Sequence, residues 1–85
     1  MSKLFDMHLF MSGVLHGSKA TKQRHLRQSL IIQAAIQKRW QRDNPWSWKA
    51  KHIRWFIVDH LKNRSINTKY YYQLTIQLIQ KRLDR

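Results

Sequence analysis

The chain lacks cysteine and glutamate altogether, and it contains little glycine or proline. Its 85 residues include no Cys, two Gly and one Pro. Without Cys there is no disulfide framework and no thiolate metal site, which fits a cytoplasmic protein. Gly and Pro are the strongest local breakers of regular structure, so their scarcity leaves few places for tight turns. The sequence therefore predicts long helices joined by few turns.

The acids are too few and too scattered to support catalysis. All four are Asp, at positions 6, 43, 59 and 84, and none is paired with another for general acid–base work. No Gly-rich phosphate loop occurs, and the five His lack the spacing of metal ligands, so no metal and no cofactor are predicted. The chain is predicted not to be an enzyme. A nuclease using His52, Asp59 and His60 is the less favoured alternative.

Basic residues dominate what is present. Seventeen Lys and Arg against four Asp give a formal net charge of +13. This charge opposes compaction, whereas neutralising phosphates releases counterions and supplies most non-specific nucleic-acid affinity. Apolar residues make up 42% of the chain, which is too much for a disordered basic tail. We therefore expect one folded basic domain with a nucleic-acid partner. A solvated basic surface without a partner is the alternative.

Two segments are expected along the chain. Residues 1–17 are predicted to form an N-terminal arm or short helix, and residues 18–85 a basic helical nucleic-acid-binding domain. The apolar stretch at 4–15 is interrupted by Asp6 and His8 and is shorter than the ~20 apolar residues of a membrane span. It also lacks the clean apolar run of a signal peptide. We expect its Leu and Phe side chains to dock on the domain, and a membrane partner is not favoured.

Helical periodicity without strand alternation predicts an all-α fold, a small bundle of three to four helices. The predicted long helices span residues 19–42, 48–63 and 68–83. Pro45 separates the first two helices, because proline cannot continue a helical hydrogen-bond ladder. The expected N-caps are, in chain order, Ser18 or Thr21, then Ser47, then Asn67 or Thr68.

The first long helix carries cations on one side. Its expected inner face is Leu26, Leu30, Ile32, Ala34, Ile36 and Trp40. The cations on the other side are Arg24, Arg27, Lys38 and Arg42. No acid balances them, so we interpret this side as a nucleic-acid contact. A merely solvated face is the alternative.

The aromatic pair after Pro45 allows two interpretations. Trp46 and Trp48 flank Ser47 at the corner between two helices. Core packing is favoured, because Trp supplies much buried area in a small domain. Stacking on unpaired bases is the alternative.

The last helix combines a broad apolar arc with a polar arc rich in amides. The polar arc consists of Lys69, Tyr70, Gln73, Gln77, Gln80 and Lys81. Gln can bridge adenine N6 and N7, and Lys can meet guanine or phosphate. We predict that this arc contacts the major groove, with an ordinary exposed face as the alternative.

The segment from Ser65 to Leu83 resembles part of a known domain. Its pattern Ser65-x-x-Thr68-x-x-x-Tyr72-x-x-x-Ile76, continued by Ile79 and Leu83, is similar to the end of the core-binding, SAM-like domain of tyrosine recombinases. The resemblance covers roughly residues 48–83. It implies a four-helix bundle that grips DNA. The family's catalytic domain is missing, so the resemblance implies a binding module, and Tyr70, Tyr71 and Tyr72 are not nucleophiles.

The favoured function is that of a small basic DNA-binding protein, a regulator or accessory factor of a phage, plasmid or mobile element. Duplex DNA is favoured over RNA. An RNA-binding protein using Trp and Tyr stacking is one alternative. A basic module that binds a membrane or an acidic protein is another. The sequence allows an oligomer and does not specify one.

Overall fold

The computed structural model describes residues 5–84, which fold into four α-helices and two shorter helical turns. The α-helices are α1 (Met7–Ser12), α2 (Lys19–Trp40), α3 (Ala50–Trp55) and α4 (Ile66–Arg82). The 3₁₀ turn η1 (Pro45–Ser47) precedes α3, and the π-helical turn η2 (Phe56–His60) continues it. No strand occurs within residues 5–84, and the predicted all-α bundle is confirmed. The remaining residues of the predicted arm and domain, 1–4 and 85, lie outside the described residues.

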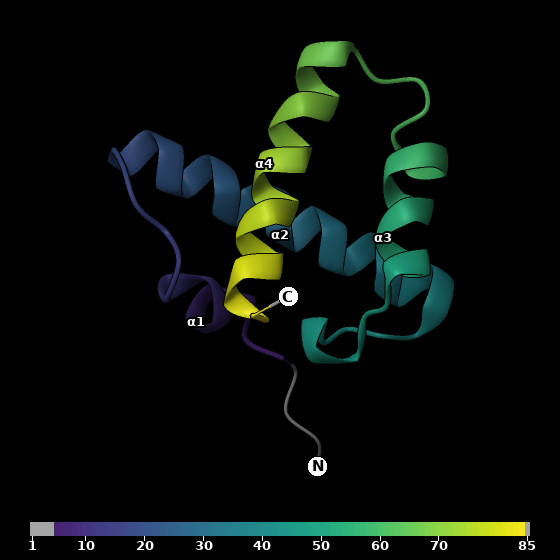
Figure 1. Cartoon of the computed structure of the whole chain (residues 1–85), viewed down its shortest axis with the longest axis horizontal. Coiled ribbons are helices and arrows are strands. Elements are labelled where there is room, and N and C mark those ends of the chain that lie inside the picture. The colour runs from purple at the N-terminus through teal and green to yellow at the C-terminus, as the bar shows by residue number, and fades with distance from the viewer. Residues whose placement is uncertain (1–4, 85) are drawn as a thin grey trace.

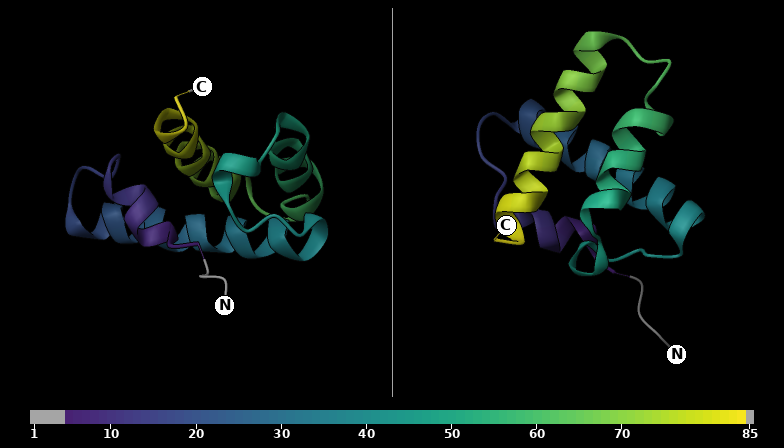
Figure 2. Two further views of the ribbon diagram at one scale, coloured as in Figure 1. Left: turned by 90° about the horizontal axis from the view of Figure 1, so that it is seen from below. Right: turned by 45° about the vertical axis from the view of Figure 1, so that its right-hand side comes forward.

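The helices are arranged in two layers (Figure 1). α2 crosses the molecule on one side, while α3 and α4 run in opposite directions across its other side. Seen from below, α2 lies along one edge of the molecule and α4 along the opposite edge (Figure 2). α1 packs against both α2 and α4. This arrangement leaves one side of α2 and one side of α4 facing solvent in opposite directions.

Both long helices begin with the same serine–threonine device. The Thr21 backbone N–H donates to Ser18 Oγ at 3.1 Å, and the Thr68 backbone N–H donates to Ser65 Oγ at 3.2 Å. Each serine hydroxyl lies 3.0 Å from the hydroxyl of its threonine. Ser18 was among the expected caps. The expectation of Asn67 or Thr68 was wrong, because Ser65 supplies the oxygen that satisfies an orphan amide.

The connection between α2 and α3 also differs from the expectation. α2 ends at Trp40, because Gln41 adopts a left-handed conformation with a φ of 54°. Ser47 does not cap α3; its hydroxyl donates instead to the Asn44 carbonyl at 2.6 Å. The residue before α3 is Lys49, whose backbone N–H donates to His52 Nδ1 at 2.9 Å. The buried His52 imidazole thus accepts a hydrogen bond from the backbone at the N-terminus of α3.

The two layers meet in one hydrophobic core to which every α-helix except α3 contributes buried apolar side chains. The buried apolar residues are Met7, Phe10, Met11, Ile32, Ile36, Trp48, Phe56, Leu61, Tyr72, Ile76 and Ile79. Three of them come from α1, so the predicted N-terminal helix belongs to the same core as the rest of the domain.

The buried stripe of α2 was only partly predicted. Leu30 is 47% exposed, and Ala34 is exposed as well. Two polar residues, His25 and Ser29, are buried in their place. The stripe continues through Ile32 and Ile36, so its spacing is helical, but two of its four members are polar. A hydrophobicity pattern assigns polar residues to the exposed side of a helix. The predicted buried face of α2 is therefore displaced around the helix axis from the observed one.

Arg82 joins three separate elements near the end of α4. Its Nε donates to the Phe10 carbonyl of α1 at 3.2 Å. Its guanidinium carbon lies 5.3 Å from the ring centroids of both Phe10 and Trp46. A Cβ atom at Gly13 would lie 3.3 Å from Arg82 Nε, which is tighter than ordinary contact. The glycine therefore leaves room for the arginine that holds α1 and η1 against α4.

Candidate nucleic-acid interface

The polar arc of α4 points into solvent. Tyr72, Thr75, Ile76 and Ile79 are buried and fix the opposite side of the helix on the core. The arc keeps the order expected from the sequence. Its exposed members are Tyr70, Gln73, Gln77, Gln80 and Lys81, and Lys69 is half-buried. The expected exposure is therefore confirmed, while the nucleic-acid role of these residues stays a prediction.

No acid interrupts this arc, because α4 contains none from Ile66 to Arg82. Ile66, at its first turn, is 84% exposed, and Tyr70, one turn later, is 55% exposed. The connection that leads into α4 adds two exposed cations, Lys62 and Arg64. The sequence reasoning missed these two, although a pair of cations just before a cap serine was the available signal.

The four cations predicted for the α2 region do not form one exposed surface in the structure. Arg27 and Lys38 are exposed on the outer side of α2. Arg24 is half-buried, and its guanidinium carbon lies 4.4 Å from the centroid of the Tyr71 ring. Arg42 follows the left-handed residue that ends the helix, so it is exposed beyond α2 and not on its face.

α2 and α4 lie on opposite sides of the bundle (Figure 2). Arg27 and Lys38 are exposed on the outer side of α2, so they lie away from the polar arc of α4. The outer side of α2 also carries exposed aliphatic side chains, with Leu30 at 47% and Ile31 at 38% exposure. A straight duplex placed along α4 does not reach both groups of cations. The predicted interface thus divides into two surfaces with different chemistry.

The two tryptophans between α2 and α3 differ in exposure, so core packing and base stacking apply to different residues. Trp48 is 1% exposed, and its Nε1 donates to the Arg42 carbonyl at 2.8 Å. Trp46 is 49% exposed and makes edge contact with Phe10, the ring centroids lying 5.5 Å apart. Core packing is confirmed for Trp48. The exposed ring of Trp46 keeps base stacking as an open prediction.

A small polar network connects α2 to α4 beneath the arc. Thr75 Oγ1 donates to Gln28 Oε1 at 2.7 Å and lies 2.8 Å from His25 Nδ1. Burial lowers the pKa of His25, and the nearby Arg24 guanidinium and His16 imidazole act in the same direction. The network therefore holds a neutral imidazole near neutral pH. It positions α4 on α2.

The two histidines of the alternative nuclease have different surroundings. His52 is 1% exposed, and its Nδ1 is already engaged at the start of α3. Burial lowers the pKa of His52, and the charges of Arg42, Lys51 and Lys49 add to the effect. His60 is exposed and stacks on Phe56 with a centroid distance of 4.9 Å. Residues 5–84 hold no cluster of three His, Cys, Asp or Glu residues suited to a metal ion.

Within the described part of the chain, no helix is long and apolar enough to cross a membrane. No protein-family model matches the sequence, and no curated protein or solved structure matches it either.

Proposed function

We propose that this protein binds duplex DNA by placing the polar arc of α4 in the major groove. The observation that carries the proposal is the composition of that arc. Amide, phenol and ammonium groups are presented on one side of α4, and no acid lies among them. Gln pairs with adenine N6 and N7, and cations meet guanine or phosphate, so these groups match the edges that a major groove exposes.

The support of α4 suits this role. At 1.5 Å per residue its 17 residues extend about 25 Å. A major groove about 12 Å wide admits such a helix. Four buried side chains hold its inner side, and Arg82 ties its last turn to α1 and η1. A rigid element is what base reading requires, because contact geometry then varies little between encounters.

We assign the recognition of DNA bases and the electrostatic attraction to phosphates to different residues. Gln73 and Gln77 read bases, and exposed Ile66 contacts a thymine methyl group at the leading end of the helix. Lys69 and Lys81, at the two ends of the arc, contact phosphates. Lys62 and Arg64 in the preceding connection do the same. Arg27 and Lys38 act at longer range and raise affinity for any polyanion.

We further propose a regulatory or accessory role at the DNA of a phage, plasmid or mobile element. This part rests on the resemblance of residues 48–83 to the core-binding domain of tyrosine recombinases.

A panel of labelled nucleic acids tests the proposal by mobility shift. Random-sequence duplex DNA, single-stranded DNA and an RNA hairpin are compared at two salt concentrations, and sites selected from a random duplex pool follow. We expect duplex to bind better than either other probe, with affinity falling steeply as salt rises. Preference for the RNA hairpin, or for single strands together with a loss in Trp46→Ala, would replace the proposal with a stacking mode of recognition.

A further inference from the structure

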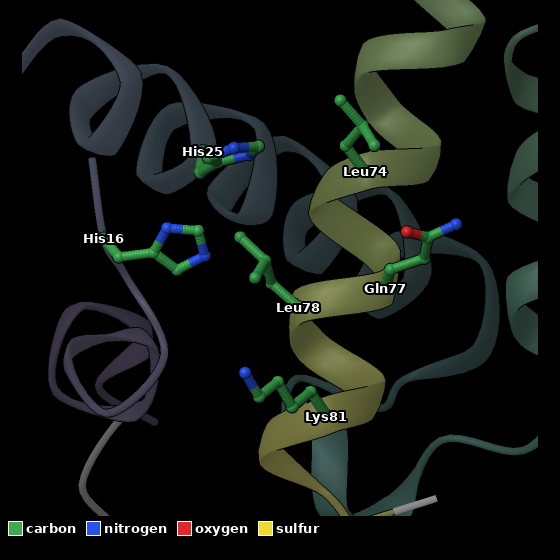
Figure 3. A pocket seen from close by; sticks show the side chains of 6 residues that line it. All are labelled: His16, His25, Leu74, Gln77, Leu78 and Lys81. Atoms are coloured by element: carbon green, nitrogen blue, oxygen red, sulfur yellow. The ribbon is translucent and has the colours of Figure 1, made fainter. Parts of the chain in front are cut away.

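A pocket of about 340 Å³ lies beside α4, between that helix, the start of α2 and the loop that follows α1 (Figure 3). Its described lining residues are His16, His25, Leu74, Gln77, Leu78 and Lys81. The His16 ring and the Lys81 ammonium reach into the same space from different elements, and the Leu78 side chain extends into it from α4. Gln77 stands at its edge with the amide turned away from His16. The pocket therefore adjoins the polar arc.

The polar chemistry of the pocket favours an anion. Lys81 is a permanent donor, and the exposed His16 imidazole offers another N–H. No acid occurs among the described lining residues to neutralise Lys81. At the back of the pocket, His25 is 7% exposed and is held by its Nδ1 contact with Thr75. An anion bound here would face cationic and N–H groups on two sides.

The apolar chemistry narrows the class of anion. Leu74 and Leu78 are half-buried and cover the wall contributed by α4. A free inorganic anion gains nothing from these side chains, whereas a ligand with a carbon skeleton next to its charge buries apolar area on them. The volume lies in the range of small-molecule pockets and exceeds what one charged group alone requires. A sugar phosphate fits both requirements.

The position of the pocket connects it with DNA. A helix in the major groove is bordered on each side by a sugar–phosphate strand. The pocket borders α4 on the side of α1 and α2, and it shares Gln77 and Lys81 with the polar arc. We infer that the pocket receives one sugar–phosphate unit of the bound strand, with its phosphate between Lys81 and His16 and its deoxyribose against Leu74 and Leu78. This inference rests on the proposed function.

A titration with deoxyribose 5-phosphate tests the pocket without DNA. At constant ionic strength, the imidazole C–H signals of His16 and His25 are followed by NMR, and His8 and His60 serve as internal controls. We expect saturable shifts confined to His16 and His25, and weaker binding of inorganic phosphate. Lys81→Gln removes a charge-assisted hydrogen bond and should lower affinity by roughly tenfold. Lys51→Gln, on the exposed side of α3, is the matched control and should change nothing. Equal shifts at all observed His, or an unaffected Lys81→Gln variant, would overturn the inference.

A second measurement separates the pocket from the DNA proposal. On duplex DNA, Lys81→Gln should reduce the slope of log affinity against log salt by about one, and Lys51→Gln should leave it unchanged. Duplex binding with an unaltered slope, together with no response to deoxyribose 5-phosphate, rejects the pocket and keeps the DNA proposal. Saturable binding of the sugar phosphate by a protein that does not bind duplex DNA rejects the DNA proposal and the assignment to a bound strand, and it keeps the pocket only as a sugar-phosphate site.

Discussion

The outer side of α2 and the polar arc of α4 carry similar charge but differ in what lies between the cations. On α2, the space between Arg27 and Lys38 is mainly aliphatic. It holds the partly exposed Leu30 and Ile31 and the exposed Ala34, with one exposed amide, Gln37, next to Lys38. On α4, amides and a phenol occupy the corresponding space between Lys69 and Lys81. Both helices lack acids. The difference teaches that positive charge attracts a polyanion, whereas the neutral polar groups beside it decide whether sequence is read.

The strongest test of this comparison removes each surface separately. Gln73→Ala combined with Gln77→Ala should abolish most preference for a selected site, since each good amide–base pair contributes about 1–3 kcal/mol of discrimination. Binding to random duplex should change little. Arg27→Gln combined with Lys38→Gln should weaken selected and random duplex by the same factor. Mobility shifts with both duplexes measure the two ratios. If the double Gln variant keeps the ratio of selected-site affinity to random-duplex affinity, the α4 arc is no more sequence-specific than the α2 surface.

A smaller effect is expected where α4 is fixed to its neighbours. Arg82→Ala removes the hydrogen bond to the Phe10 carbonyl and two aromatic contacts, so we expect a loss of about 1–3 kcal/mol in the free energy of unfolding. Urea unfolding followed by circular dichroism measures it. Arg39→Ala is the control, because Arg39 also stacks on an aromatic ring, Trp40, but joins no second element. Equal losses in the two variants would show that the contacts of Arg82 with α1 and η1 add no more stability than the contact of Arg39 within α2.

A more gradual effect should follow pH, through the imidazoles that lie between the two layers. The pKa of His25 and the pKa of His52 are both lowered in the folded protein, chiefly by burial. Below pH ~6.5, the usual value for an unfolded imidazole, the unfolded chain binds more protons than the folded one. Stability is therefore full above that pH and falls as pH drops through it toward the lower folded values. Urea midpoints at pH 7.5 and 5.5 measure the loss. His25→Gln should reduce this pH dependence, whereas His8→Gln, at an exposed position, should retain it.

The architecture was predictable to the extent that apolar spacing specifies it. Helices over 19–42 and 68–83 have long periodic patterns, and the structure places both within two residues of those bounds. The arc of α4 was predictable for the same reason, because its polar and apolar sides are cleanly divided. The inner stripe of α2 was not, since its buried members His25 and Ser29 are polar. His25 contacts Thr75 of α4, and the Ser29 hydroxyl donates to the Leu26 carbonyl within α2 itself.

The limits at the candidate site have a similar cause. The pocket brings His16 from a loop next to Lys81 at the far end of the chain, and no local pattern reports such a meeting. The corner at Trp46 and Trp48 was assigned as a unit, although the two rings have opposite surroundings. The start of α3 also escaped prediction. Ser47 and Lys49 are separated by one residue, and only three-dimensional contacts decide which of them precedes the helix.

The contact between Arg82 and Phe10 also has a consequence for the order of folding. It closes almost the whole chain into a loop, so it becomes favourable only after the intervening helices have shortened the distance between its two ends. α1 has only six residues, too few for a stable helix in isolation. We therefore expect α1 to dock last, after α2 and α4 have packed together. In native-state hydrogen exchange its amides should then open before those of the helix that carries the polar arc.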